Sequence, residues 1–240
     1  MIFKKGSKEN PLRVFSFGNG VDSFTVFVAQ IMGKLQSPFD FYVFANVGNN
    51  AENPETLRHF NEVVVPLAKK HNIGLVEVCR KDKEGNPVDL YDFVIDESKI
   101  GVPIPLIMKG SGYMKRACTS DWKVLPFTKW IDNYAKENEI EYVEIGIGFN
   151  LSEQRRREKR GAWSEQWHNE IESKDDEFSY DMDDLFGDDS EKHHENGKKS
   201  KKLKYFRRYI YPIMDELRFN RATCVSFIQE SGFGVPESSE

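Results

Sequence analysis

The feature that most constrains the fold is a glycine-rich turn between an apolar run and an amphipathic run. The turn lies in the octapeptide Ser16–Ser23, which reads Ser-Phe-Gly-Asn-Gly-Val-Asp-Ser. The apolar residues of Arg13–Phe17 before it are typical of a buried strand, and the spacing in Thr25–Met32 after it favours a helix. A strand that enters a helix through a tight turn places the turn at the carboxyl end of a parallel sheet. Open α/β sheets bind their ligands at that edge.

The residues within the turn favour binding of an anion. Gly18 and Gly20 can adopt positive φ, and without a Cβ they let a ligand approach the backbone. Asp22 and Ser23 are good N-cap residues, so we expect the helix to start at one of them, with its free N–H groups facing an anion. The pattern is neither a Walker A loop nor a dinucleotide fingerprint, because both need other residues at fixed spacing. An ordinary strand-to-helix turn is the alternative interpretation.

The chain after the turn continues to alternate between strands and helices. The run Phe39–Ala45 is too short for a helix and predicts a buried strand. Asn53 followed by Pro54 predicts a helix start, and apolar residues recur at helical spacing from there to His71. The run Gly74–Cys79 predicts a third strand. This order predicts a parallel sheet with right-handed crossovers, within one compact α/β domain.

Amide and small residues follow the second predicted strand. The stretch Phe44–Thr56 contains Asn46 and Gly48 at the expected carboxyl edge of the sheet, beside the glycine turn. Amides and backbone groups at this place can contact an adenine edge or a ribose hydroxyl. Asn and Gly are also ordinary turn residues, so a plain loop is the alternative.

Two cations flank a predicted helix start further along the chain. An amphipathic helix is expected after Thr119 or Ser120 as its cap, with Arg116 just before it and Lys123 one turn inside. Positive charge at a helix N-terminus opposes the macrodipole unless an anion lies between the cations. The pattern therefore indicates a phosphate or sulfate, with a basic surface helix as the alternative.

Tyr142–Ile147 predicts another strand, which leads into a basic segment that ends at Arg157. Basic residues there suit a polyphosphate or a solvated helix face. The segment 173–204 is acidic and then basic, with few apolar residues, and predicts a disordered insertion between residues 1–172 and 205–240. His193 and His194 lie within it, where a solvated run is favoured over a metal site.

The composition limits the class of partner. The 34 basic and 39 acidic residues give a net charge of −5, so the chain as a whole carries no nucleic-acid footprint. No apolar run approaches the roughly 20 residues that span a bilayer. The three cysteines, Cys79, Cys118 and Cys224, are too scattered for a disulfide framework and favour a reducing cytoplasm. The sequence leaves the oligomeric state open, including a homo-oligomer.

Four segments resemble one family in the same order along the chain. The octapeptide resembles the pyrophosphate (PP) loop of the adenine nucleotide α-hydrolase superfamily, in the form found in its phosphoadenosine phosphosulfate (PAPS) reductase-like branch. Asn19 stands where the family has a second glycine. The other matching segments are Phe44–Thr56, Arg116–Pro126 (Arg116, Cys118, Thr119, Lys123 and Pro126) and Gly146–Arg157, where Ser152 replaces an aspartate. The C-terminal part of the family's pattern resembles this sequence at Tyr211, Pro212, Arg221 or Arg218, Cys224, Gly234 and Pro236. In the family, that pattern continues with a cysteine pair that this sequence lacks.

The resemblance implies a Rossmann-like fold of the HUP type, a parallel sheet sandwiched by helices, and a set of site residues. ATP or PAPS, with Mg²⁺, is the implied ligand. The implied nucleotide-binding residues are Ser16, Gly18, Asn19, Gly20, Asp22, Ser23, Asn46 and Gly48. The implied catalytic residues are Asp22, Arg116, Lys123 and Arg155. Cys118 and Cys224 would be half of an iron–sulfur or zinc site that needs two cysteines absent from this chain, and two small buried hydrophobic residues are the alternative.

Three functions follow from these expectations. The favoured one is ATP-dependent adenylation of an acceptor with release of pyrophosphate. The second is thiol-dependent reduction of a sulfonucleotide, for which the family's C-terminal cysteine tail is not present. The third is a nucleotide-binding module without chemistry. The acceptor is not identified, and nucleic acid enters only as one substrate for modification.

Overall fold

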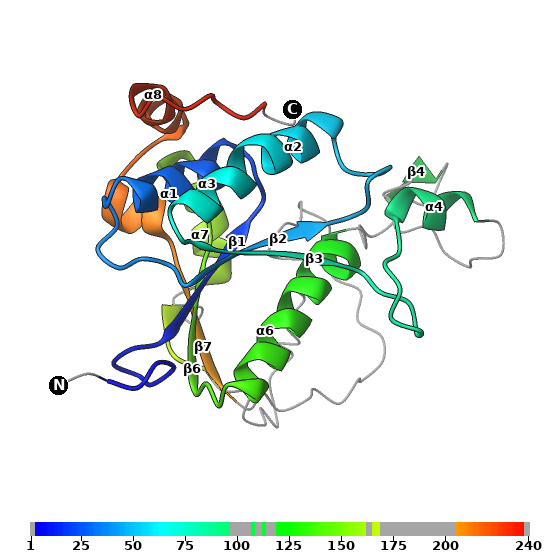
Figure 1. The fold of residues 1–240 in the computed structure, drawn as a ribbon, viewed down its shortest axis with the longest axis horizontal. Coiled ribbons are helices and arrows are strands. Elements are labelled where there is room, and N and C mark those ends of the chain that lie inside the picture. Colours follow the sequence, from blue (N-terminus) through cyan, green and yellow to red (C-terminus); the bar gives the residue numbers. More distant parts are fainter. Residues whose placement is uncertain are drawn as a thin grey trace.

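The computed structural model describes residues 3–96, 107–108, 112–113, 119–161, 165–168 and 205–237. A parallel sheet of five strands runs through the centre of the molecule, in the order β3-β2-β1-β6-β7 (Figure 1). The strands are β1 Leu12–Phe17, β2 Phe41–Asn46, β3 Gly74–Cys79, β6 Tyr142–Gly146 and β7 Phe206–Ile210. A separate antiparallel pair joins β4 Ile107–Met108 to β5 Gly112–Tyr113. The parallel sheet confirms the predicted α/β class.

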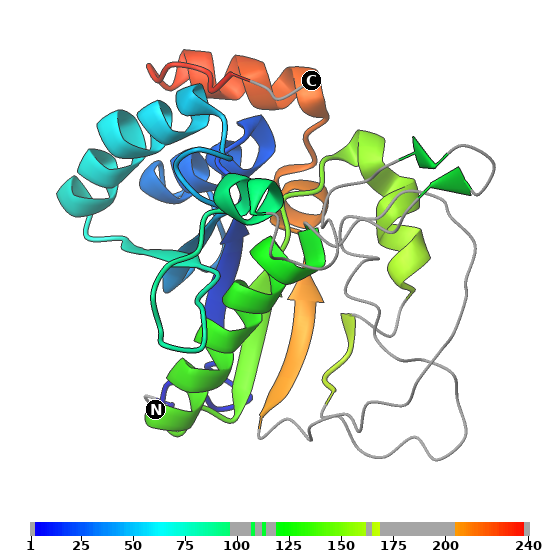
Figure 2. The same cartoon turned by 90° about the vertical axis from the view of Figure 1, so that its right-hand side faces the viewer.

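Helices cover both faces of this sheet (Figures 1 and 2). On one face, Phe15 and Phe17 of β1 pack into a core with α1 (Val21–Ile31) and α8 (Arg221–Glu230). The helical run α2 (Pro54–His59), η1 (Phe60–Val64) and α3 (Val65–Lys70) joins the same core. On the other face, Val14 of β1 packs against α6 (Leu125–Glu137). The remaining elements are α4 Leu90–Ile95, η2 Ser120–Val124, η3 Leu151–Glu153, α7 Gln154–Arg160 and η6 Ile213–Leu217.

Local capping explains where several helices begin. The Asn53 side chain accepts a hydrogen bond from Glu55 N at 2.8 Å, and Pro54 takes the first helical position, as the sequence predicts. Asn220 caps α8 in the same way through Thr223 N. The predicted cap at Thr119 or Ser120 is wrong. Thr119 already has helical φ and ψ, its side chain makes no capping bond, and a π-helical turn over η2 leads directly into α6.

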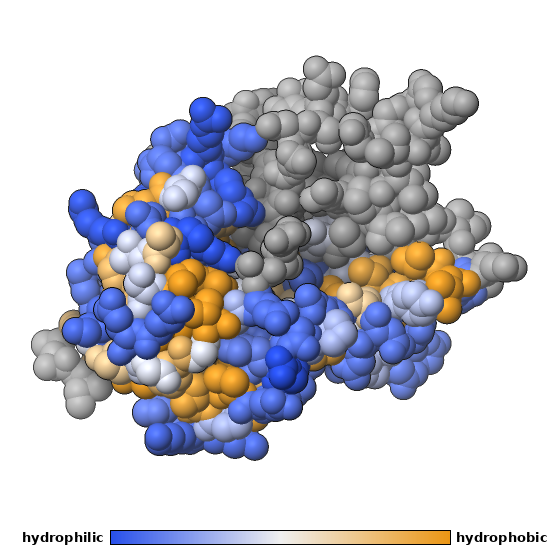
Figure 3. Space-filling view, turned by 90° about the horizontal axis from the view of Figure 1, so that it is seen from above, coloured by the Kyte–Doolittle hydropathy of each residue, from blue (hydrophilic) through white to orange (hydrophobic). Residues whose placement is uncertain are grey.

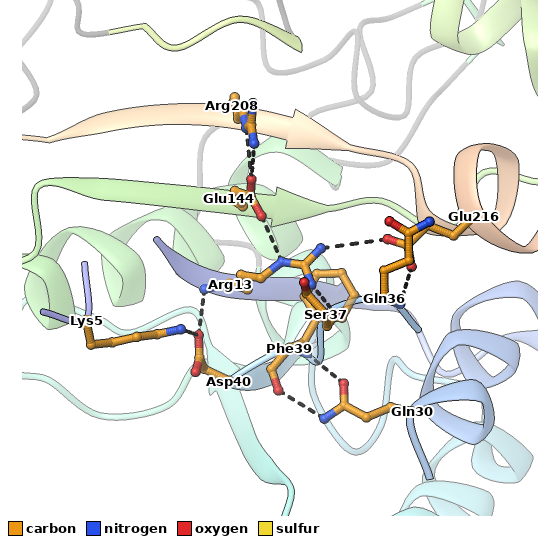
Figure 4. A network of polar contacts seen from close by, with 10 residues as sticks. All are labelled: Lys5, Arg13, Gln30, Gln36, Ser37, Phe39, Asp40, Glu144, Arg208 and Glu216. Atoms are coloured by element: carbon orange, nitrogen blue, oxygen red, sulfur yellow. Dashed lines mark hydrogen bonds and ion pairs between the residues drawn. The ribbon is translucent and has the colours of Figure 1, made fainter. Parts of the chain in front are cut away.

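A buried network of charges ties the central strands together (Figure 4). The Arg13 Nε of β1 donates to Glu144 of β6 at 2.7 Å, and Arg208 Nε of β7 donates to the other carboxylate oxygen at 2.9 Å. The Arg13 and Glu144 side chains are 10% and 7% exposed. Glu144 therefore compensates the charges of two arginines, which lie on the strands to either side of β6. We assign Glu144 a structural role.

The side of the molecule near α8 is mostly hydrophilic, with apolar residues in separate groups (Figure 3). Large exposed apolar side chains include Met32 at the end of α1 and Tyr91 and Ile95 on α4. Within the described residues, no helix is long and apolar enough to cross a membrane. The predicted insertion 173–204, with His193 and His194, lies outside the described residues.

Candidate functional site

The glycine turn lies where the order of strands reverses. From β1 the chain crosses to β2 on one side, and β6 pairs with β1 on the other side, so β1 and β6 form the switch point of the sheet. The segment after β6 returns to the turn, because a Cβ on Gly148 would lie 3.4 Å from Ser23 N. The glycine turn after β1 and the segment after β6 are therefore neighbours at the carboxyl edge of the sheet.

The backbone of the turn leaves the start of α1 uncapped. Helix α1 begins at Val21 with Gly20 as its N-cap in an extended conformation, and no side chain in the described part of the chain caps it. The predicted start at Asp22 or Ser23 is therefore wrong. A Cβ built on Gly18 or Gly20 would meet nothing within 4 Å. The turn thus exposes its backbone beside a helix N-terminus, which is the arrangement that binds phosphate groups.

Asn19 provides the left-handed residue of the turn. Its φ is 55°, while neither Gly18 nor Gly20 has positive φ, so the left-handed conformation expected at the glycines lies at Asn19 instead. Asn is one of the few side chains that tolerates this region, which explains how it can occupy a glycine position. Its buried amide donates to Thr56 O at 2.7 Å and accepts from His59 Nδ1 at 2.9 Å. The Asn19 side chain therefore anchors the turn to α2.

Asp22 and Ser23 occupy the first turn of α1 and bond within the protein. Asp22 Oδ2 accepts from Asn150 Nδ2 and from Arg221 Nη1, each at 2.9 Å. Its other oxygen, Oδ1, is buried and has no partner among the described residues. Ser23 Oγ donates to Gly20 O at 2.9 Å, which closes the turn onto the helix.

The segment after β2 is shaped by its own polar residues. Asn46 Oδ1 accepts from Gly48 N at 2.9 Å, and Asn46 Nδ2 donates to Glu77 at 2.7 Å. Gly48 has φ of 124°, and a Cβ there would lie 2.3 Å from the Asp89 carboxylate carbon. These two residues hold the loop in place, and the observed bonds of Asn46 are within the protein.

A cavity of about 270 Å³ opens beside the turn, on the α6 face of the sheet. Ser16 and Gly18 line it together with Lys123, whose Nζ lies 3.2 Å from Glu52 Oε2. Most of the wall is apolar or aromatic: Phe17, Val43, Phe44, Ala45, Val124, Phe127, Ile131, Ile145, Ile147, Tyr205 and Tyr209. Thr119, Thr128 and Arg207 also line the cavity. The structure therefore brings the turn, the end of β2 and Lys123 together around one space.

The other predicted cations and cysteines are not brought to this cavity. Arg116 and Cys118 lie outside the described residues. Arg155 is exposed on α7 and is not among the described residues that line the cavity. Cys224 is buried in α8, and burial raises the pKa of its thiol to about 12. Within the described residues, no group of three His, Cys, Asp or Glu side chains could hold a metal ion.

Sequence reasoning missed Asn150 and Arg160. Asn150 accepts from Ser152 N at 2.8 Å, and its backbone N–H donates to Glu153, which makes a capping box at η3. The spacing Asn-x-x-Glu before a helix was a usable signal for it. Arg160 is half-buried, with its guanidinium beside the rings of Phe149 and Tyr209, and no local pattern distinguishes it from the other arginines of α7.

The chain is thus an α/β protein with a parallel sheet and a cavity beside the glycine turn at the switch point of that sheet. Comparison of the chain with protein-family models, with curated proteins and with solved structures finds no match.

Proposed function

We propose that this chain is a PAPS reductase-like member of the PP-loop superfamily that binds ATP and adenylates an acceptor. The observation that carries the proposal is the uncapped N-terminus of α1 behind two glycines whose Cβ directions are open. A side chain at either glycine would occupy the space in front of the backbone N–H groups, where phosphate oxygens would lie. The ordered resemblance of four sequence segments supplies the choice of an adenine nucleotide.

The size and lining of the cavity support this placement. Whole small-molecule sites measure about 300–1,000 Å³, so a space of about 270 Å³ suits the base and sugar of a nucleotide. The phosphates would then extend over Gly18 and Gly20 to α1. The apolar wall suits the faces of an adenine ring, and Lys123 at the rim suits a phosphate oxygen.

The proposed reaction is attack of an acceptor oxyanion on the α-phosphorus of ATP. A bond forms between the acceptor oxygen and the α-phosphorus, and the bond to the bridging oxygen breaks, so that pyrophosphate leaves. Lys123 and the backbone N–H groups at the start of α1 would stabilise the negative charge that develops on the phosphates. Mg²⁺ would arrive with the triphosphate, which supplies most of its ligands. Asp22 Oδ1, which has no partner among the described residues, is the protein oxygen suited to contact it.

The environment of Cys224 argues against sulfonucleotide reduction through this residue. Reduction needs a thiolate nucleophile. With a thiol pKa of about 12, only about one molecule in 10⁵ would carry the thiolate at pH 7. Cys224 belongs to the buried core that joins α8 and α1, which instead suits a packing role.

The experiment that separates the three functions is to identify the nucleotide and its products. Native mass spectrometry of the purified chain would detect co-purifying ATP, AMP or PAPS. Phosphorus NMR after incubation with ATP, in buffer and with a deproteinised cell extract as a source of acceptors, would then identify the bond that breaks. AMP and pyrophosphate support adenylation, and sulfite released from PAPS supports reduction. ATP bound and returned intact identifies a module without chemistry.

A further inference from the structure

Helix α7 carries four arginines, and three of them differ in their partners. Arg156 pairs with Glu153, and Arg157 pairs with both Glu165 and Asp215. Arg160 has no carboxylate partner among the described residues. It is nevertheless the arginine whose guanidinium is most enclosed, stacked 4.9 Å from the Tyr209 ring centroid and 5.6 Å from that of Phe149. A buried charge without a partner is costly in a folded protein, so its retention calls for an explanation.

The unpartnered atoms of Arg160 are the two that together bind an oxyanion. Its Nε and Nη2 are buried and make no hydrogen bond to any described residue. These two N–H groups point the same way along one edge of the guanidinium, and form the fork that takes two oxygens of a carboxylate, sulfate or phosphate. In Arg157 the same fork is filled, with Nε 2.9 Å and Nη2 3.2 Å from the two oxygens of Glu165.

The surroundings of Arg160 fit a bound anion. A hydrogen bond to Tyr211 holds the guanidinium, and burial lowers the pKa of Arg160 from its ordinary value, as expected where no carboxylate compensates the charge. The carbonyl end of α7 offers partial compensation only. Tyr209, on which the guanidinium stacks, also lines the cavity beside the glycine turn. One side chain therefore lies between the proposed nucleotide site and the two N–H groups of Arg160 that have no partner among the described residues.

We propose that the Nε and Nη2 fork of Arg160 binds an oxyanion of the acceptor, a carboxylate or a phosphate or sulfate group, beside the nucleotide. That this oxyanion belongs to the acceptor rests on the proposed adenylation. Binding of an oxyanion by Arg160 does not rest on it. The acceptor class that follows is an acidic small molecule.

The test measures binding of inorganic sulfate and of acetate by calorimetric titration at constant ionic strength. Each variant is made in the natural sequence and in a Gly20→Val background, because the glycine turn would also bind sulfate. We expect Arg160→Met and Arg160→Lys to weaken binding at least tenfold for whichever of the two anions the natural protein binds more tightly. Neither methionine nor lysine has the Nε and Nη2 fork. The adjacent exposed cation provides the matched control, and Lys159→Met should leave the affinity unchanged. Tighter binding of acetate would indicate a carboxylate acceptor, and tighter binding of sulfate a phosphate or sulfate group.

Thermal unfolding without added anion gives an independent result. Arg160→Met should leave the melting temperature unchanged or raise it, because it removes an uncompensated charge. A clear fall would show that an acidic residue of the chain pairs with Arg160 and would overturn the proposal. Absence of anion binding by the natural protein, or unchanged affinity in both Arg160 variants, would also overturn it. ATP titration separates this from the proposed function, because Arg160→Met should keep ATP binding while Gly20→Val loses it and keeps the oxyanion.

Discussion

Replacing Asn19 by alanine and by glycine tests how the turn is held. Both variants lose the bonds to Thr56 O and His59, and each such bond contributes about 0.5–1.5 kcal/mol. Both should therefore be less stable by about 1–3 kcal/mol. Alanine, unlike glycine, is also strained by the left-handed conformation of this position, where φ is 55°. After allowance for the greater freedom of glycine in the unfolded chain, alanine should be the worse by about 1 kcal/mol.

Differential scanning calorimetry measures this difference directly. In a chain of this length, 1 kcal/mol shifts the melting temperature by about 2–4 °C, so Asn19→Ala should melt that much below Asn19→Gly. Asn72, an exposed residue with φ of 52°, provides the control pair. There alanine should again be worse than glycine, but without the loss common to both Asn19 variants. Equal melting temperatures for the two Asn19 variants would refute the left-handed turn, and unchanged ones would refute its anchoring to α2.

Three further predictions concern single side chains. Glu144→Gln should cost about 3–5 kcal/mol, measured by urea denaturation, because it leaves the buried Arg13 and the half-buried Arg208 without their shared carboxylate; a loss below 1 kcal/mol would contradict the network. Burial lowers the pKa of His59, so the folded state binds fewer protons than the unfolded state, and stability should fall as the pH drops below about 6.5. Unfolding of the natural protein and of His59→Gln from pH 7.5 to 5 would reveal this, and identical pH profiles would exclude it. Lys123→Gln should change stability by less than about 1 kcal/mol, because its ion pair is 41% exposed on the lysine side, yet weaken ATP binding at least tenfold; a large loss of stability with normal binding would make Lys123 structural.

The sheet and most helix boundaries could be predicted because local physics determines them. Gly74–Cys79 forms β3 with the predicted bounds, and β1 extends the predicted run by one residue at Leu12. The caps Asn53 and Asn220 each act on a backbone N–H two or three residues away. At α1 the same reasoning failed. Ser and Asp are favoured caps in general, but the extended backbone of Gly20 starts the helix one residue before Asp22.

The candidate site was predictable where it depends on backbone and not where it depends on distant pairing. The glycine turn and the end of β2 meet because parallel strands share an edge, which the strand order alone implies. The bonds of Asp22 to Asn150 and Arg221 join residues more than 100 positions apart. Helix α7 has no apolar stripe in Gln154–Arg160, so the sequence could not tell that Arg160 turns inward while Arg155 stays exposed.

The central claim is that phosphate groups bind the backbone of the glycine turn, and calorimetric titration with ATP tests it most directly. The comparison is between the natural protein, Gly20→Val and the control Gly234→Val. In both positions a Cβ would meet nothing within 4 Å, so both variants should fold, but only the first places a side chain where the phosphates would lie. ATP binding that is lost in Gly20→Val and kept in Gly234→Val is the predicted result. Equal ATP affinity in all three proteins would contradict the account.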